Sequence, residues 1–559
     1  MFNLGLDFGS TYTTVSIYRE ETKNLESIVM SQSSPFVPTV LAEYKGKIEY
    51  GRAGKKLTGK KDAKVYKGFK MLIPERDAKI LLKRGYDEVN TPVAVSEKFI
   101  DRILTEVMND CHEECIDNIV VGVPEIWNDG MKTIDGRTIV RDILRRLDYV
   151  KNIQVVSEPA AASAFFSYNF QMCTGKCFEG KMLLIDYGGG TLDITLTDVA
   201  TRRNKRDEDS VEIKVLDRTG AGENEDGVIG KAGIVYMESV AMEAINQCDS
   251  IDEENFIKDG KFFKIVDVLE EELQDRVNIV EEIFDEYGTD YPEDLEDEEF
   301  TTLEYKGEDV PVTFRMLLDV YNRIIYPVLN EKLDECITYM INHDINYMER
   351  NEDNFKIALV GGFSNFYLVK KQIKDKFKFS EFDKRQENII LNRADCEKAI
   401  SLGTALLAAG VIDIRNTAAY SIGVAVKTID GQVARDYAIK YHQDIEFNKP
   451  YFAKDKDGNE NLIFSSSGGV SQFIINMKED DNVAIIVPIK DQLKDRLTNI
   501  IQNETMVVAI GFSVDSSGVL SIHVHDYDFA TGTLSDKGQT IELSRFNDLF
   551  EVTKVERVM

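Results

Sequence analysis

Two segments far apart in the chain repeat one pattern: an apolar run that ends in aspartate, then a turn of glycine and hydroxyl residues. The first is Asp7-Phe8-Gly9-Ser10-Thr11, and the second is Asp186-Tyr187-Gly188-Gly189-Gly190-Thr191. Glycine lets the backbone approach a phosphate chain closely, and successive N–H groups in such a turn can donate to phosphate oxygens. The pattern therefore predicts a phosphate-binding site built from two turns.

Both kinds of group in these turns have an expected role. Carboxylates at strand ends suit Mg²⁺, which prefers oxygen ligands and keeps several waters, so Asp7 and Asp186 are expected to hold this metal. The N–H groups and hydroxyls are expected to donate to the phosphates of a bound nucleotide. The expected donors are Gly9, Ser10, Thr11, Tyr12, Gly188, Gly189, Gly190 and Thr191.

A third glycine turn, Gly361-Gly362, follows the apolar residues Leu359 and Val360 and precedes a segment with helical spacing. A strand that meets a helix start in this way can pack a nucleoside. Gly361 and Gly362 are therefore expected to complete one nucleotide site with the two aspartate turns. Three unrelated glycine turns are the alternative interpretation.

The elements that must position these residues alternate between strands and helices. Residues 3–18 and 183–197 each predict two strands around a small-residue turn. Residues 119–124 and 153–157 predict buried strands, and 137–147 has helical spacing. Because the hairpin occurs once in each half of the first part of the chain, we expect a duplicated, two-lobed α/β body.

Short alternating strands with turn signals dominate residues 420–545, which predicts an antiparallel β domain. Only 489–502 interrupts them with helical periodicity. The predicted domains are a nucleotide-binding domain at 1–410, a linker at 411–419 and a β-rich domain at 420–559.

Composition limits the classes of partner. Of 559 residues, 43% are hydrophobic and 30% are charged, which is typical of a soluble globular protein, and the formal net charge is −31. A negative field repels phosphate backbones and anionic lipids, so neither nucleic acid nor a membrane is an expected main partner. The absence of a signal-like start and of a membrane-length apolar run predicts a cytoplasmic location. The acidic segment 281–309 is expected to be a solvated surface.

Several segments, in the same order, resemble the seventy-kilodalton heat-shock chaperones. In the first part of the chain they are GLDFGSTYTTVSIY, VVGVPEIWND, VVSEPAAASAFF, LLIDYGGGTLDITL and LVGGFSNFYLVKKQI. The segment MVVAIGFSVDSSGVLSIHVHDYDFATGT, at 506–533, is similar to the last strands of that family's peptide-binding domain. The resemblance therefore extends over essentially the whole chain.

The resemblance implies an actin-like ATPase domain of two ribonuclease H-like lobes, followed by an antiparallel β-sandwich. It implies slow, Mg²⁺-dependent hydrolysis of ATP to ADP and phosphate, by in-line attack of water on the γ-phosphate. The partners that it implies are unfolded or extended protein segments, together with a cochaperone or a nucleotide exchange factor.

The family's functional residues match named positions here. Lys70 matches a lysine that steadies the γ-phosphate, and Pro124 matches a proline that relays nucleotide state to the other domain. Each of these residues, taken singly, also has an ordinary structural interpretation. Lys70 could be a surface lysine, Pro124 could end a strand, and Glu158 could be a charge at a helix N-terminus. The catalytic residues implied are Lys70, Glu158, Asp186 and Thr191, and the metal residues implied are Asp7, Asp186 and Asp193.

In the β-rich domain, Val424, Val426, Phe473 and Ile475 fall where the family lines a cleft for an extended apolar peptide. Such a cleft gains affinity from main-chain hydrogen bonds and from pockets for alternate side chains. Strand alternation would equally place these residues in an ordinary core, and both readings stay open.

The chain departs from the family pattern at several positions. The family's Gly-Gly-Ser-Thr-Arg is Gly361-Gly362-Phe363-Ser364-Asn365 here, so Phe363 joins the expected cofactor site and an arginine that stacks on the base is replaced by Asn365. The family's Gly-Gly-Glu-Asp is matched by Ala221-Gly222-Glu223-Asn224. Arg276 is the nearest candidate for the family's adenosine-contacting cation. We expect no helical lid after the β-rich domain.

Three functions are consistent with these patterns. The first is a chaperone-like ATPase without a lid that binds extended apolar segments. The second is a nucleotide-switched scaffold, or a dedicated partner-binding protein, with weak ATPase activity. The third is a small-molecule kinase on the same two-lobed body, against which the β-rich domain and Glu158-Pro159-Ala160 argue.

Overall fold

The structure is a computed structural model that describes most of the chain. The predicted helix at 489–502 lies outside the described residues, as do Glu223 and Asn224. The described residues are 1–30, 34–128, 135–203, 209–222, 230–247, 260–289, 292–296, 298–305, 307–349, 354–378, 396–415, 418, 421–427, 433–440, 443, 445–446, 448–454, 462–464, 472–476, 484–488, 507–515, 520–528, 530–542 and 556–558.

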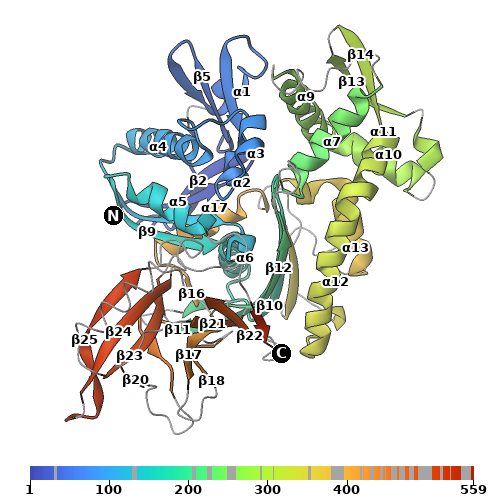
Figure 1. The fold of residues 1–559 in the computed structure, drawn as a ribbon. Helices are drawn as coiled ribbons and strands as arrows, with labels where there is room; N and C mark the ends of the chain where they lie inside the picture. Colours follow the sequence, from blue (N-terminus) through green and yellow to red (C-terminus); the bar gives the residue numbers. More distant parts are fainter. Residues whose placement is uncertain are drawn as a thin grey trace. The chain divides into compact units, whose positions relative to one another are not determined.

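The chain is mixed α/β and contains several sheets (Figure 1). It divides into two compact units. The first is Met1–Ile126 with Ile143–Asp413, and the second is Trp127–Asp142 with Ile414–Met559.

The first large sheet has the order β3-β2-β1-β8-β9, with β4 paired to β2. β1 pairs antiparallel with β2 across the first aspartate turn, and it pairs parallel with β8. This confirms the predicted hairpin at 3–18 and the strands at 119–124 and 153–157. The bounds are β1 Asn3–Phe8, β2 Tyr12–Arg19, β3 Asn24–Ser27, β4 Val37–Pro38, β8 Ile116–Val123 and β9 Val150–Ser157.

The second large sheet repeats this pattern around the second aspartate turn. β10 pairs antiparallel with β11 and parallel with β15, and β11 pairs antiparallel with β12. The predicted hairpin at 183–197 is confirmed. The bounds are β10 Gly180–Tyr187, β11 Leu192–Arg203, β12 Asp209–Ala221 and β15 Phe355–Val360.

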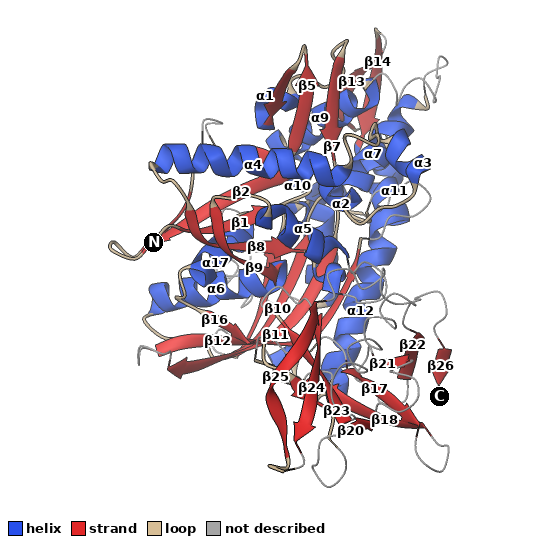
Figure 2. Ribbon diagram, turned by 60° about the vertical axis from the view of Figure 1, so that its left-hand side comes forward, coloured by secondary structure: helices blue, strands red, loops and turns tan. Residues whose placement is uncertain are grey.

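Helices cover both faces of the first sheet (Figure 2). On one face, the ring of Phe8 lies 6.3 Å from that of Phe99 in α4 (Pro92–Cys111). On the other face, a Cβ at Gly5 would lie 2.2 Å from the N atom of Ala405 in α17 (Ala399–Ala408), so only glycine allows this approach. Because alternate residues of a strand share a face, Asp7 points to the α17 side.

Helix α6 (Glu158–Thr174) packs against strands of both large sheets. At its start the Ser157 hydroxyl accepts from the N–H of Ala160, and Pro159 occupies the first turn. In the second sheet, Ser163 of α6 bonds the Thr197 hydroxyl at 3.3 Å. The α6 N-terminus therefore carries Glu158 to the space between the two aspartate strands.

The other face of the second sheet packs on an apolar core cluster of the first unit. Leu183, Ile185 and Tyr187 of β10 belong to this cluster, so Asp186 faces the opposite side. The helices that contribute to it are α7 Gly233–Ile245, α9 Lys261–Asp275, α10 Val277–Tyr287, α11 Phe314–Val320, η3 Tyr321–Ile325, α12 Tyr326–Asn342 and α13 Tyr367–Lys376.

Two smaller sheets complete the described part of this unit: β6-β5-β7 and the hairpin β13-β14. The acidic segment 281–309 contributes to α10, η2, β13 and β14. The remaining bounds, which include η1 and α5 at the division between the two units, are β5 Val40–Tyr44, β6 Lys47–Tyr50, α1 Gly51–Lys55, β7 Ala63–Lys67, α2 Phe69–Leu72, α3 Ala78–Lys83, η1 Glu125–Asn128, α5 Asp135–Arg145, η2 Pro292–Leu295, β13 Glu299–Tyr305, β14 Glu308–Thr313, η4 Tyr347–Glu349 and η5 Phe363–Asn365.

In the second unit, all described strand pairs are antiparallel, as the turn signals predict. The sheets are β18-β17-β21-β22-β26 and β19-β23-β24-β25, with β20 paired to β23. The bounds are β17 Ser421–Lys427, β18 Val433–Ile439, β19 Tyr451–Phe452, β20 Leu462–Phe464, β21 Gln472–Asn476, β22 Ala484–Pro488, β23 Val507–Val514, β24 Leu520–Asp528, β25 Thr533–Glu542 and β26 Glu556–Val558.

The predicted linker differs from the structure in one respect. Residues Asp413–Arg415 form a strand, β16, within 411–419. Apolar and polar residues alternate in Ile412-Asp413-Ile414-Arg415, and Ile412 is buried, so this stretch has strand character that a free linker lacks. Among the described residues, no helix is both long enough and apolar enough to cross a membrane.

The sheet of β23, β24 and β25 contains a buried histidine that predicts a pH dependence. His523 Nε2 lies 2.6 Å from the Ser513 hydroxyl, and Nδ1 lies 3.1 Å from that of Thr540. Burial, and secondarily His525, lower the pKa of His523 from its usual 6.5. As the pH falls through 6.5, His523 binds a proton more readily in the unfolded chain than in the folded one. Acid therefore lowers the free energy of unfolding.

We expect the urea midpoint of unfolding, followed by circular dichroism, to be lower at about pH 5.5 than at about pH 7.5. The fall should be smaller in His523→Gln, whereas the exposed His343→Gln should keep the wild-type dependence. An identical pH dependence in His523→Gln and wild type would show that His523 does not cause it.

Candidate functional site

A cavity of about 800 Å³ lies in the first unit, and both aspartate turns line it. The third glycine turn lines the same cavity, so the structure brings together most residues that the sequence singled out. These are Asp7, Gly9, Ser10, Thr11, Tyr12, Lys70, Glu158, Asp186, Gly188, Gly189, Gly190, Thr191, Gly361, Gly362 and Phe363. Asp193 is fully buried beside them, and neither it nor Pro124 lines the cavity.

The first turn is held by its carbonyl groups. The Thr39 hydroxyl donates to the Gly9 carbonyl at 2.8 Å, and the Thr39 N–H donates to the Thr11 carbonyl at 2.8 Å. Within the described part of the chain, the N–H groups of Ser10 and Thr11 donate no hydrogen bond. These amides are therefore available to a ligand in the cavity.

The second turn is held in the same way. Its Gly188 and Gly189 carbonyls accept from the N–H groups of Gly233 and Ile234, at the start of α7, at 3.2 and 2.7 Å. The N–H groups of Gly189 and Gly190 have no acceptor among the described residues. Two sets of unused donors thus line one cavity, which is the arrangement that binds anions.

The two turns face each other at close range. A Cβ at Gly189 would lie 2.2 Å from the Thr11 hydroxyl oxygen, and one at Gly190 would lie 2.9 Å from that of Ser10. A side chain at Gly189 would clash with the Thr11 hydroxyl, and one at Gly190 would first clash with Met71, whose Sδ would lie 2.4 Å from the added Cβ. The close contact explains why both segments use small residues.

Acidic groups converge beside the turns. Glu158 Oε1 accepts from Lys70 Nζ at 2.6 Å, and both side chains are buried. Burial, with Glu158 as the next cause, raises the pKa of Asp7 to about 7, and Lys70 opposes the rise. Burial also raises the pKa of Asp186, followed by Glu158, Asp193 and Asp7. The cluster therefore holds more acidic groups than its one lysine can neutralise.

Asp186 has unused coordinating capacity. It is 4% exposed, and its Oδ2 atom has no hydrogen-bond partner in the described structure. Its other oxygen lies against Gly361, where φ is +81° and a Cβ would be 2.6 Å from Asp186 Oδ1. Gly361 thus leaves the carboxylate room, and the free oxygen and donor set fit a hard divalent cation such as Mg²⁺.

Phe363 lines the cavity while its ring joins an aromatic cluster. Its centroid lies 5.1 Å from that of Tyr187 and 5.4 Å from that of Tyr236. Asn365 also lines the cavity, and it is 4% exposed. The position that the family gives to a stacking arginine is therefore occupied by a short, buried amide.

Ion pairs around the cavity were not predicted from the sequence. Lys55 Nζ lies 3.1 Å from Glu270 of α9, and Lys67 pairs with Asp267 of the same helix. Burial raises the pKa of Glu270. Asp267 and Glu270 are one helical turn apart, which indicates that they share one side of α9. Their partners are remote in the sequence, so the spacing alone does not predict these ion pairs.

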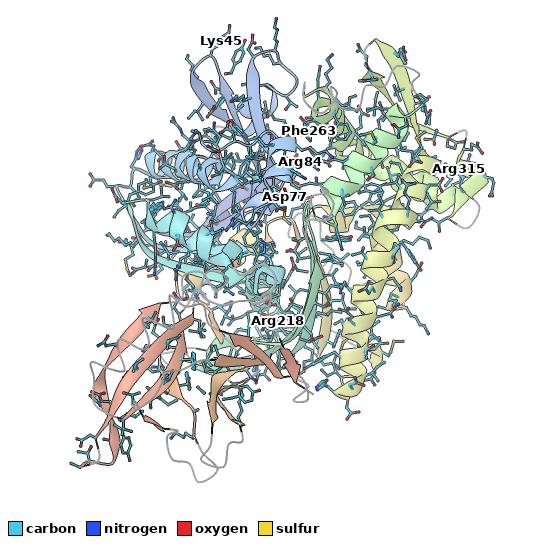
Figure 3. The ribbon with its side chains drawn as sticks, in the orientation of Figure 1. Lys45, Asp77, Arg84, Arg218, Phe263 and Arg315 are labelled. Carbon is cyan, nitrogen blue, oxygen red and sulfur yellow. The ribbon has the colours of Figure 1, made fainter. Side chains whose placement is uncertain are left out.

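A third unpredicted ion pair joins Arg84 to α7 (Figure 3). Its two terminal nitrogens donate to Glu238 at 2.7 and 3.0 Å, and the guanidinium lies 5.8 Å from the Phe263 ring centroid. Arg84 belongs to a basic set that lines the cavity. Its members are Arg52, Lys55, Lys60, Lys64, Lys67, Lys70, Lys83 and Arg84.

Arg276, the candidate for a nucleoside contact, does not line the cavity in the described structure. Its guanidinium donates to the Phe300 carbonyl at 2.6 Å and pairs with Glu272 at 2.8 Å. It lies at the break between α9 and α10, which turns it away from the side on which Gln274 and Val277 line the cavity.

Two other predicted groups lie outside the cavity. Pro124 is buried after β8, and the next residue, Glu125, accepts from Arg218 of β12 at 2.6 Å (Figure 3).

In the second unit, the register pairs Val424 of β17 with Phe473 of β21. The side chains of the proposed peptide-cleft residues are outside the described structure, so a relay and a peptide cleft stay predictions.

No protein-family model matches the chain. It is 25% identical over 226 residues to "Heat shock cognate 70 kDa protein 3" of Dictyostelium discoideum, covering 36% of this chain and 34% of the relative. It is 26% identical over 212 residues to "Chaperone protein HscA" of Buchnera aphidicola subsp. Acyrthosiphon pisum, covering 34% and 32%. A "Heat shock 70 kDa protein" of Neurospora crassa is 26% identical over 220 residues, covering 34% and 31%.

The matches thus span about a third of the length of the curated relatives. They support a relation to the seventy-kilodalton heat-shock chaperones. Activity, substrates and partners do not follow from a match of this extent.

The buried cluster predicts an asymmetric effect on stability. Lys70→Met would leave the acidic groups without their cation, and breaking a buried ion pair costs roughly 3 kcal/mol. Glu158→Gln should cost less, because Lys70 would still act on Asp7 and Asp186. Urea unfolding of both single variants and the double variant measures the coupling.

The matched control is the exposed pair Lys151–Asp117, with Nζ and Oδ1 2.7 Å apart. Lys151→Met should cost much less stability than Lys70→Met, because solvent screens an exposed pair. Equal costs for Lys70→Met and Lys151→Met would contradict the assignment of Lys70 as the charge that stabilises this cluster.

Proposed function

We propose that this chain binds and hydrolyses ATP with Mg²⁺ in the cavity between the two aspartate turns, and that it acts as a chaperone-like ATPase on extended apolar protein segments. The observation that carries the proposal is the contact between these turns, with free backbone donors on both and an unpartnered Asp186 oxygen beside them. The similarity to heat-shock chaperones supports it.

The proposed architecture is an actin-like domain at 1–410, a linker at 411–419 and a β-sandwich domain at 420–559. The repeated arrangement of a hairpin and a parallel strand in the two large sheets supports a duplicated, two-lobed body. A cytoplasmic location stays a prediction from composition.

Within the proposed site, the chain's own groups have separate tasks. The N–H groups of Ser10, Thr11, Gly189 and Gly190 bind the phosphate oxygens, with the Thr11 and Thr191 hydroxyls beside them. Asp7 and Asp186 would hold the metal, with Asp193 as a further acid behind Asp186. Bound Mg²⁺ would neutralise charge on the β- and γ-phosphates.

Lys70 and Glu158 are proposed to act on the terminal phosphate and on water. The 2.6 Å hydrogen bond fixes the Lys70 ammonium, so that it can steady the γ-phosphate. Glu158 is held at the start of α6 and can orient the attacking water with its second oxygen. Groups fixed in this way lose little freedom when the transition state forms.

Peptide binding is assigned to the second unit, at Val424, Val426, Phe473 and Ile475. The antiparallel pairing of β17 and β21 supports adjacent positions for these residues. The proposed partners are unfolded or extended segments, with a cochaperone or nucleotide exchange factor acting on the first unit. The replacement of the family's arginine by Asn365 favours one alternative, a nucleotide-switched binding protein with weak ATPase activity.

ATP turnover with and without unfolded apolar peptides tests the proposal. Asp186→Asn and Lys70→Ala should each lower kcat by roughly 100-fold or more, because each removes a fixed charge that acts on the developing phosphate charge. Peptide should stimulate the wild type and should stimulate neither variant.

The matched controls are Asp148→Asn and Lys45→Ala, which change exposed residues outside the cavity and should keep wild-type turnover. Nucleotide binding without turnover in the wild type would favour the switched binding protein. Failure to bind any magnesium nucleotide would contradict both.

A further inference from the structure

Helix α6 carries Glu158 at its first residue, and the two turns that follow have small side chains, mostly alanine. A Cβ at Gly403 would lie 1.8 Å from the Ala161 carbonyl oxygen, so α6 packs closely on α17 beside the first sheet. Alanine and serine form only low ridges, and such ridges do little to fix how far a helix lies along its neighbour. The position of α6 on the second sheet therefore depends on specific contacts.

A buried chain of two hydrogen bonds joins α6 to both strands of the second aspartate hairpin. The Thr197 hydroxyl donates to the Met182 carbonyl at 3.2 Å. Because a hydroxyl has one proton to donate, Ser163 is the donor in the 3.3 Å bond between the Ser163 and Thr197 hydroxyls. Both hydroxyl side chains are fully buried. The chain therefore connects α6, β11 and β10 in that order.

This chain of hydrogen bonds lies at a defined level along the strands that carry the aspartates. The register places Met182 of β10 opposite Thr197 of β11, and it places Asp186 opposite Asp193. On each strand the two levels are four residues apart, and residues separated by an even number share one face of a sheet. The hydrogen bonds and the two carboxylates thus lie at two levels on the face that meets α6.

Glu158 is the carboxylate that α6 contributes at the level of the aspartates. Its Oε1 atom accepts from Lys70 of α2 at 2.6 Å. Burial, followed by Glu158, raises the pKa of Asp186, so these two carboxylates lie within electrostatic reach of each other. All residues from Glu158 to Ser163 are helical, which makes this part of α6 a rigid spacer. A shift of α6 along β11 would therefore move Glu158 relative to Asp186.

We propose that Ser163 is a positioning residue: its hydrogen bond to Thr197 fixes the level of α6 on the second sheet and so holds Glu158 in place beside Asp186. The inference rests on the proposed function, in which Glu158 orients the attacking water and Asp186 holds the metal. Neither Ser163 nor Thr197 lines the cavity. Their loss should therefore slow the reaction step without weakening nucleotide binding, for which the turns supply the donors.

The test measures kcat for ATP and the Kd of Mg–ATP, by calorimetry, in Ser163→Ala and Thr197→Val. Each change removes one hydroxyl of the pair, and each should lower kcat by roughly tenfold, because a shift of about 1 Å in a positioned group can cost about 100-fold. The Kd of Mg–ATP should stay within about twofold of wild type. Thr197→Ser, which keeps the hydroxyl, should keep most of the wild-type kcat. The double variant should be no slower than the slower single variant, because both changes break the same hydrogen bond.

Matched controls lie on the same helix and the same strand. Ser167 of α6 and Thr195 of β11 are fully buried, and their hydroxyl oxygens have no hydrogen-bond partner in the described structure. Ser167→Ala and Thr195→Val therefore make the same chemical changes without breaking the chain from α6 to β10. Both should keep the wild-type kcat.

Two results would overturn the inference while the proposed function stands. One is an unchanged kcat in Ser163→Ala and Thr197→Val, even with lower urea midpoints, which would give this hydrogen bond a structural role alone. The other is an equal loss of kcat in Ser167→Ala and Ser163→Ala. If Ser163→Ala does not fold by circular dichroism, the comparison of Thr197→Val with Thr197→Ser decides the question. If the wild type does not turn over ATP, the proposed function fails first, and the inference fails with it.

Discussion

Placing several carboxylates around one buried ammonium group is the constraint on which the cavity depends. Asp7 and Asp186 come from different sheets, and Glu158 comes from the helix that packs against both. Lys70 is the cation that opposes the raised pKa of both aspartates. Such a cluster is unfavourable unless a further cation or protons join it. The glycine turns, the free amides and the unpartnered Asp186 oxygen all surround this one point, which is why we treat it as the functional centre.

Local elements were predictable where the signal lies within a short stretch of sequence. The hairpins around Gly9 and Gly188 follow from apolar runs on each side of a small-residue turn. That the two turns share a site followed from their repetition. The pair between Lys55 and Glu270 could not be deduced, because 215 residues separate its members and a charge pattern does not specify a partner.

Arg276 was a candidate on the family resemblance alone, and it does not line the cavity. α9 ends at Asp275 and α10 begins at Val277, so Arg276 occupies a break with non-helical backbone angles. The strand in the predicted linker was missed because three residues are too few to distinguish a strand from an extended connection.

The basic side chains that line the cavity have a consequence for how a ligand arrives. The chain as a whole carries a net charge of −31, yet Arg52, Lys60, Lys64 and Lys83 all belong to the cavity wall. A diffusing polyphosphate is repelled by most of the surface and attracted near these residues, so the electric field guides it to productive encounters. Added electrolyte weakens the repulsion and the attraction together, and the balance between them determines how association speed varies with ionic strength.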